Sequence, residues 1–97
     1  MKISEFQSLI KEIYFKKDLK RGINNTFIWL IEEIGELARV LRSKVLDKQY
    51  ASEELADIIA WSNSLANLLE IDLESALLKK YPDKCIKCKS KPCVCQK

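Results

Sequence analysis

The 97-residue sequence contains no histidine and has only two glycines and two prolines. The absence of histidine excludes an imidazole general base. The chain also has no nucleophile elbow and no glycine-rich phosphate loop, which argues against a serine triad and a P-loop mechanism. With so little glycine and proline, and with 47% hydrophobic and 32% charged residues, the composition favours a globular helical protein over a sheet.

Membrane and export signals are also missing. No apolar run approaches the roughly 18 residues that a membrane span requires. The start, Met-Lys-Ile-Ser-Glu, contains neither a signal peptide nor a lipidation motif. We therefore expect a cytoplasmic protein with no membrane partner.

Charge is divided unevenly along the chain. Residues 79–97 hold seven lysines and one aspartate, whereas the first 78 residues carry ten basic and thirteen acidic groups. Because most of the chain is acidic, we expect no broad nucleic-acid surface, although a basic tail can still touch phosphate. A chain of this size forms only a marginally stable core, so we expect support from an oligomer or a metal ion.

Apolar residues spaced by three and four predict four helices. Ser4 with Gln7 fits a capping box, Asn24 and Asn25 can cap the second helix, Asp47 or Ser52 the third, and Asp72 the fourth. The predicted ranges are 5–16, about 26–42, a third helix reaching about residue 69, and 73–80, ended by Pro82. We expect an all-α antiparallel helical bundle over 1–82, completed by oligomerisation, and a short Cys-rich tail over 83–97.

A helical wheel gives the second and third predicted helices two faces each. One face is apolar; it carries Phe27, Leu30, Ile31, Ile34, Leu37, Ala38 and Leu41 on the second helix and Leu55, Ile58, Ile59, Leu65, Ala66 and Leu69 on the third. The other face mixes acids with apolar residues: Trp29, Glu33, Glu36 and Val40, then Glu54, Asp57, Trp61 and Leu68. One chain has too few helices to cover four faces, so we expect the acid-bearing faces to meet another subunit or a ligand.

Two carboxylate motifs dominate the chemistry, Glu32-Glu33-x-x-Glu36 and Glu54-x-x-Asp57. Acids three or four residues apart share one helix face, so each motif can direct several oxygens to one point. Each acid alone would be a solvated helix charge, but two such clusters on consecutive helices, each beside a tryptophan, favour a cation site. Mg²⁺ is the expected ion, with Mn²⁺ as the alternative. Glu32 points to another side of its helix, so its carboxylate can equally form an ion pair or bind the metal ion.

The order and spacing of the two motifs resemble the signature of the all-α nucleoside triphosphate pyrophosphohydrolases. The resemblance covers roughly residues 3–81. Three sequence segments are MazG-like in particular: Glu33-Ile-Gly-Glu36-Leu, Glu54-Leu-Ala-Asp57-Ile-Ile and Ile71-Asp-Leu-Glu-Ser-Ala76. The resemblance implies Mg²⁺-dependent hydrolysis of a nucleoside triphosphate to the monophosphate and pyrophosphate, by dimers or tetramers of helical protomers. It also implies catalytic metal ligation by Glu33, Glu36, Glu54 and Asp57, with Glu32 in support.

Substrate contacts are less sharply indicated. Trp29 and Trp61 are either core aromatics or surfaces for base stacking. Asn63 and Asn67 follow the acids on the third helix, where we expect polar surface rather than nucleotide contacts.

The end of the predicted fourth helix departs from the family pattern. MazG-like proteins often continue this helix through a lysine and an asparagine that reach the substrate phosphate. Here the chain reads Leu77-Leu-Lys-Lys-Tyr-Pro82 and no asparagine follows. Lys79 and Lys80 therefore remain candidates for phosphate binding without that second partner.

Four cysteines lie within eleven residues, as Cys85-x2-Cys88-x4-Cys93-x-Cys95. In a chain without a secretion signal, such clustering favours Zn²⁺ coordination over a disulfide framework. Disulfides and free thiols stay open as alternatives, because the final Cys-x-Cys is tighter than the usual Cys-x-x-Cys. A closed site of four cysteines leaves no open position for catalysis, so its role would be structural or for binding.

A second class of function is a non-catalytic helical oligomer whose basic zinc knuckle binds nucleic acid or protein. Lys87, Lys89 and Lys91, which lie among the cysteines, support it, but the tail has no stacking aromatic beyond Tyr81. A third is a helical scaffold without activity that keeps its acids for ion pairing. Mg²⁺-dependent pyrophosphate release distinguishes the enzyme from both.

Overall fold

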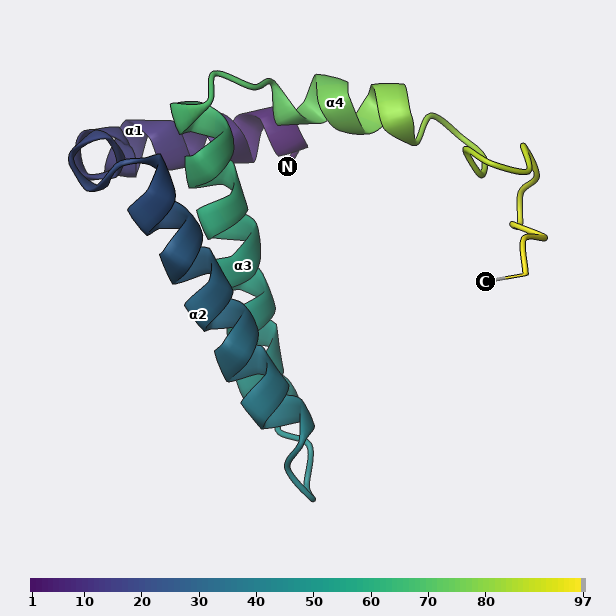
Figure 1. The fold of residues 1–97 in the computed structure, drawn as a ribbon, viewed down its shortest axis with the longest axis horizontal. Coiled ribbons are helices and arrows are strands. Elements are labelled where there is room, and N and C mark those ends of the chain that lie inside the picture. Colours follow the sequence, from purple (N-terminus) through teal and green to yellow (C-terminus); the bar gives the residue numbers. More distant parts are fainter. Residues whose placement is uncertain (97) are drawn as a thin grey trace.

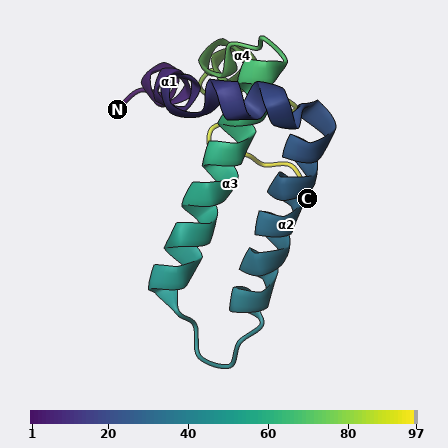
Figure 2. The same cartoon turned by 90° about the vertical axis from the view of Figure 1, so that its left-hand side faces the viewer.

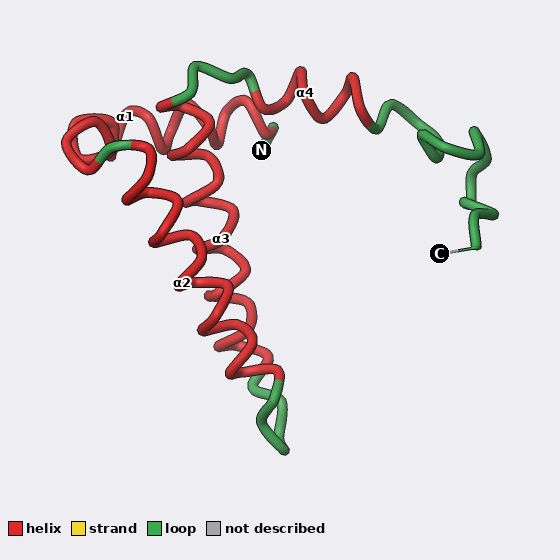
Figure 3. The backbone as a smooth tube through the Cα atoms, in the orientation of Figure 1, coloured by secondary structure: helices red, strands yellow, loops and turns green. Residues whose placement is uncertain are grey.

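The protein is described over residues 1–96 by a computed structural model, and this part of the chain contains four helices and no strand (Figure 3). The helices are α1 (Ile3–Arg21), α2 (Ile23–Leu41), α3 (Lys48–Leu68) and α4 (Leu73–Lys80). α2 and α3 form an antiparallel hairpin, and α1 crosses the end of the hairpin opposite the loop 42–47 (Figures 1 and 2). The prediction of an all-α protein is confirmed.

Gly22 joins α1 directly to α2. Its φ of 86° lies in the left-handed region that glycine adopts without a steric penalty. The Gly22 N–H donates to the Asp18 carbonyl at 2.9 Å, and its carbonyl accepts from the Thr26 N–H at 3.0 Å, so one residue ends α1 and begins α2. The prediction that α1 stops at residue 16 is therefore wrong, as are the predicted caps at Asn24 and Asn25, which lie inside α2.

The start of α1 also differs from the prediction. The Glu5 carboxylate accepts from the Lys2 N–H at 2.8 Å, so the helix begins two residues earlier than the expected residue 5. Ser4 does not cap the helix; its backbone N–H donates to the Glu74 carboxylate of α4 at 3.1 Å. A side chain from another helix thus satisfies a free N–H in the first turn of α1.

Asp47 and Asp72 begin α3 and α4 as predicted. Each aspartate accepts from a backbone N–H three residues later, that of Tyr50 at 3.0 Å and that of Ser75 at 3.2 Å. Between the two helices, Glu70 adopts a left-handed φ of 56° and closes the C-terminal end of α3.

Gln7 binds α1 to the connection between α3 and α4. Its side-chain amide donates to the Asn67 Oδ1 at 3.0 Å and to the Ile71 carbonyl at 2.7 Å, and its Oε1 accepts from the Leu73 N–H at 3.0 Å. Asn67 is buried, as is Asn63, whose Nδ2 donates to the Ile59 carbonyl at 2.8 Å. The expectation that both asparagines lie on polar surface is wrong: both are buried, Asn67 in contact with Gln7 of α1 and Asn63 bonded within α3.

The helix faces pack differently from the prediction. On the acid-bearing faces Glu54 is buried and Glu33, Val40 and Trp61 are half-buried, so these faces lie partly in the interior of the hairpin. Trp29, Glu36 and Asp57 on the same faces are exposed. Much of the expected core stripe is instead exposed. We call this set the exposed apolar stripe: Phe27, Ile31, Ile34, Leu41, Leu55 and Ile59.

Few hydrophobic side chains are buried within the single chain. Over the described residues, the only buried hydrophobic side chains are Ile10 and Ala66, whereas Asp18, Thr26 and Asn63 are almost completely buried. Exposed apolar surface on this scale exceeds what a monomeric protein usually carries.

No helix among residues 1–96 combines the length and the apolar character that crossing a membrane requires.

Candidate active site

The two tryptophans fix the register of the hairpin. The rings of Trp29 on α2 and Trp61 on α3 stack with centroids 6.1 Å apart and planes 12° apart. Because α2 and α3 are antiparallel, two helix turns further along α2 from Trp29 correspond to two turns back along α3 from Trp61. Glu36 is thereby brought beside Glu54.

Three carboxylates meet between α2 and α3. Glu33, Glu36 and Glu54 each place one carboxylate oxygen within 4.8 Å of those of the other two, and we call them the acid cluster. Glu54 is only 5% exposed. One oxygen of Glu54 and one of Glu33 are buried and have no hydrogen-bond partner within the described residues.

The electrostatics of the acid cluster show the cost of this arrangement. Burial first, and then the neighbouring carboxyls of Glu33 and Glu36, together raise the pKa of Glu54 from 4.5 to about 7. Buried carboxylate oxygens without partners are costly unless a cation neutralises them. Three converging hard oxygen ligands fit Mg²⁺ or Mn²⁺, so these residues suit the ion that the sequence predicted.

Asp57 and Glu32 are not part of this group of three. Asp57 lies one turn after Glu54 on α3, and in the register of the hairpin it falls opposite Glu33, but its side chain is exposed. Glu32 is also exposed. Both stay predictions as metal ligands.

A cavity of about 290 Å³ opens beside Glu36. Its lining combines two acids, a cation and an aromatic ring: Glu36, Arg39, Val40, Ser43, Asp47 and Tyr50. Arg39 and Tyr50 were not among the sequence-predicted site residues. The sequence could have identified Arg39, because it lies three residues after Glu36 and therefore on the same side of the helix.

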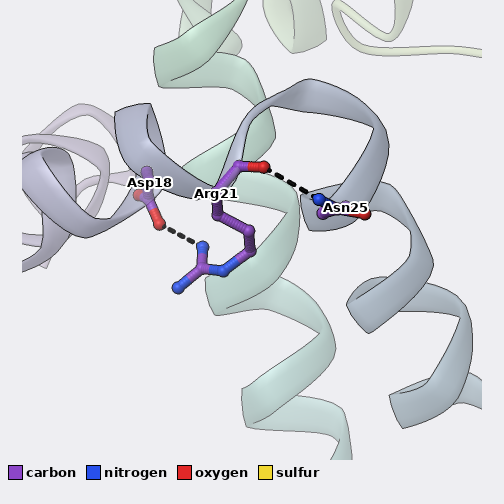
Figure 4. Close-up of polar contacts among 3 residues, drawn as sticks. All are labelled: Asp18, Arg21 and Asn25. Carbon is purple, nitrogen blue, oxygen red and sulfur yellow. Dashed lines mark hydrogen bonds and ion pairs between the residues drawn. The ribbon is translucent and has the colours of Figure 1, made fainter.

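Arg21 is a third residue that the sequence did not predict as part of the site. Its guanidinium lies over the Trp61 ring, 4.7 Å from the centroid, and donates to the Asp18 carboxylate at 2.7 Å. Its backbone carbonyl accepts from the Asn25 side-chain amide at 3.2 Å, so Asn25 holds the backbone at the corner between α1 and α2 while Asp18 orients the guanidinium (Figure 4). Trp61 is therefore held between α2 and this corner, while Trp29 stays 46% exposed.

The sequence model of one family, described as the MazG nucleotide pyrophosphohydrolase domain, matches residues 21–89. The chain belongs to the MazG family. Among curated proteins, none matches the chain.

The MazG match begins at the end of α1 and includes the whole hairpin with its acid cluster. It continues past α4 into the first half of the cysteine segment and so reaches Cys85 and Cys88. The resemblance expected over 3–81 is thus displaced toward the C-terminus, and α1 lies almost entirely outside the matched range.

Lys79 and Lys80 lie in the last turn of α4, which points away from the MazG hairpin (Figure 1). They line a separate cavity of about 320 Å³ together with Lys84 and Lys89. Within one chain, the structure does not place these lysines beside the acid cluster, so their role in phosphate binding remains a prediction.

The four cysteines form a second cluster, with all four sulfur atoms within 4.8 Å of one another. All four are free thiols. The backbone N–H groups of Val94 and Ser90 lower the pKa of Cys88 to about 6, whereas the neighbouring thiols, Cys93 first, raise the pKa of Cys95 to about 11. The structure places the four cysteines together, and the cluster can hold a metal ion, while Zn²⁺ coordination stays a prediction.

Proposed function

We propose that this MazG-family protein is a Mg²⁺-dependent nucleoside triphosphate pyrophosphohydrolase that cleaves the bond between the α and β phosphates. The products would be the nucleoside monophosphate and pyrophosphate. The observation that carries the proposal is the acid cluster, in which a buried Glu54 is held against Glu33 and Glu36 with oxygens left unpartnered. A nucleoside triphosphate is consistent with the family match.

Glu33, Glu36 and Glu54 would hold the ion, and Asp57 would join them from the next turn of α3. Once bound, Mg²⁺ supplies neutralisation and orientation of the phosphates and polarises the attacking water. A carboxylate of the site accepts the proton of that water, because the chain has no histidine for this task. Trp29, with its ring partly exposed beside the acid cluster, would stack on the base.

We further propose that the active form is a homodimer or homotetramer in the cytoplasm. The exposed apolar stripe supports this assembly, because surface of that kind on α2 and α3 is stabilised when a second copy covers it. Covering the stripe would also stiffen the hairpin that positions the acid cluster.

The test is a panel of canonical and oxidised nucleoside triphosphates incubated with Mg²⁺, with chromatographic identification of the monophosphate and pyrophosphate. Glu36→Gln should abolish most of the release. Glu53→Gln is the matched control, because Glu53 is an exposed acid next to Glu54 that accepts from Gln49 at 3.1 Å and lies outside the acid cluster. If no nucleotide in the panel is cleaved and the protein instead binds RNA or DNA in a salt-dependent manner, the basic binding module replaces the enzyme.

A further inference from the structure

All four cysteine sulfurs lie within 4.8 Å of one another, and two of the pairs have the separation expected in a tetrahedral metal site. A Zn–S bond of about 2.3 Å places the sulfurs of a regular tetrahedron about 3.8 Å apart. The sulfur atoms of Cys85 and Cys95 are 3.8 Å apart, and those of Cys88 and Cys93 are 3.9 Å apart. A disulfide requires a separation of about 2.05 Å, so neither pair has the geometry of that bond.

The backbone around the cysteines is arranged to support thiolates. Cys85 exchanges two backbone hydrogen bonds with the turn that follows it: its carbonyl accepts from Lys89, and its N–H donates to Ser90, both at 3.0 Å. The Val94 N–H donates to the Cys88 sulfur at 3.4 Å, and the Cys95 N–H donates to the Cys93 sulfur at 3.3 Å. Donors aimed at ligand sulfurs are the usual outer support of a thiolate site.

Packing alone does not explain why this segment folds back on itself. Residues 83–96 contain no helix and no strand. Their larger apolar side chains remain on the surface, with Ile86 39% and Val94 71% exposed. A segment without a core needs a cross-link or a metal ion to offset its conformational entropy.

We propose that Cys85, Cys88, Cys93 and Cys95 bind one Zn²⁺ per chain in a closed tetrahedral thiolate site. Four protein ligands leave no open coordination position, so the ion is structural. It holds residues 83–96 beside the end of α4 and thereby fixes Lys84 and Lys89 around the cavity that Lys79 and Lys80 also line. This site is separate from the acid cluster and does not depend on the proposed hydrolase activity.

The experiment uses the full chain, purified without chelator and without added reductant, and measures zinc by elemental analysis. The wild type should hold one zinc per chain, released when a mercurial reagent modifies the thiols. Cys88→Ser and Cys93→Ser should each lose most of the zinc, while Ser90→Ala, a neighbouring substitution that leaves all four thiols in place, should keep it. Glu36→Gln should also keep its zinc, which separates this proposal from the nucleotide proposal.

Cobalt provides a readout that is independent of purification history. Co²⁺ added to the metal-free full chain should give the intense visible absorption of a tetrahedral thiolate site, and Zn²⁺ should displace it. Absence of zinc with four freely titratable thiols overturns the proposal, as does thiol reactivity that appears only after reduction. Zinc that remains bound in both serine variants also overturns it.

Discussion

Glu54→Gln tests the central physical feature of the acid cluster, a buried carboxylate whose charge needs a cation. The substitution keeps the shape of a side chain that is 5% exposed and removes its charge. In the folded chain, burial and the adjacent Glu33 and Glu36 raise the pKa of Glu54 from 4.5 to about 7. Between these two values the folded state binds the proton more tightly than the unfolded state, so the free energy of unfolding falls as pH rises. The glutamine of Glu54→Gln does not ionise, so it removes this contribution to the pH dependence of the free energy of unfolding.

Metal binding should follow the ionisation of the same group. With a pKa of about 7, the ionised fraction of Glu54 rises from about one tenth at pH 6 to about nine tenths at pH 8. Because the carboxylate must be ionised to bind the ion, the apparent affinity for Mg²⁺ or Mn²⁺ should increase about tenfold over this range. Glu54→Gln should bind the ion at least about tenfold more weakly and should lose that pH dependence.

Two measurements check this reasoning. Isothermal titration with Mn²⁺ at pH 6, 7 and 8 compares the wild type, Glu54→Gln and the control Glu53→Gln, in buffers of different ionisation enthalpy to count released protons. Thermal melts in metal-free buffer should show Glu54→Gln gaining stability relative to the wild type between pH 5 and pH 8. An affinity of the wild type that does not change with pH, or equal affinity of wild type and Glu54→Gln, would refute the account.

Three other predictions follow from the contacts. Glu36→Gln and Asp57→Asn should each lower turnover at least ~100-fold in a pyrophosphate-release assay while leaving the circular dichroism spectrum unchanged. Gln7→Ala should lower the free energy of unfolding by about 1–3 kcal/mol in a urea melt, because it leaves polar groups of the α3–α4 connection unpaired, whereas the exposed Gln49→Ala should stay within about 0.5 kcal/mol of wild type. Light scattering should give a multiple of 11.3 kDa for the wild type, and Ile31→Glu, which places a charge in the exposed apolar stripe, should shift the mass toward 11.3 kDa.

The helix starts that the sequence predicted correctly depend on local chemistry. Asp47 and Asp72 cap α3 and α4 through their own side chains, an interaction that spans three residues and is visible in the sequence. The junction between α1 and α2 escaped prediction because a single glycine with positive φ performs the turn, so no polar loop separates the two helices. Local sequence patterns therefore identify helix N-caps better than they identify a turn made by a single glycine.

The acid cluster was predictable because its three members lie on two helices with clear spacing. Glu33 and Glu36 share one face of α2, and antiparallel pairing with α3 brings Glu54 to them. Arg21 was not predictable in the same way. Its position over Trp61 depends on the crossing of α1 over the hairpin, a tertiary relation that no local pattern encodes.

The exposed apolar stripe and the acid cluster lie on the same two helices, α2 and α3. A helical wheel identifies apolar stripes but does not decide which stripe packs within the chain and which stays outside. Here the acids lie between α2 and α3 while Ile31 and Ile59 lie exposed, 49% and 56%, on the same two helices. Ile31→Glu should therefore separate assembly from metal binding. If the monomer that it produces binds Mn²⁺ with the pH dependence of the wild type, one hairpin suffices to build the cation site. If the affinity falls together with the mass, covering the exposed apolar stripe is what holds α2 and α3 at the spacing the three carboxylates require.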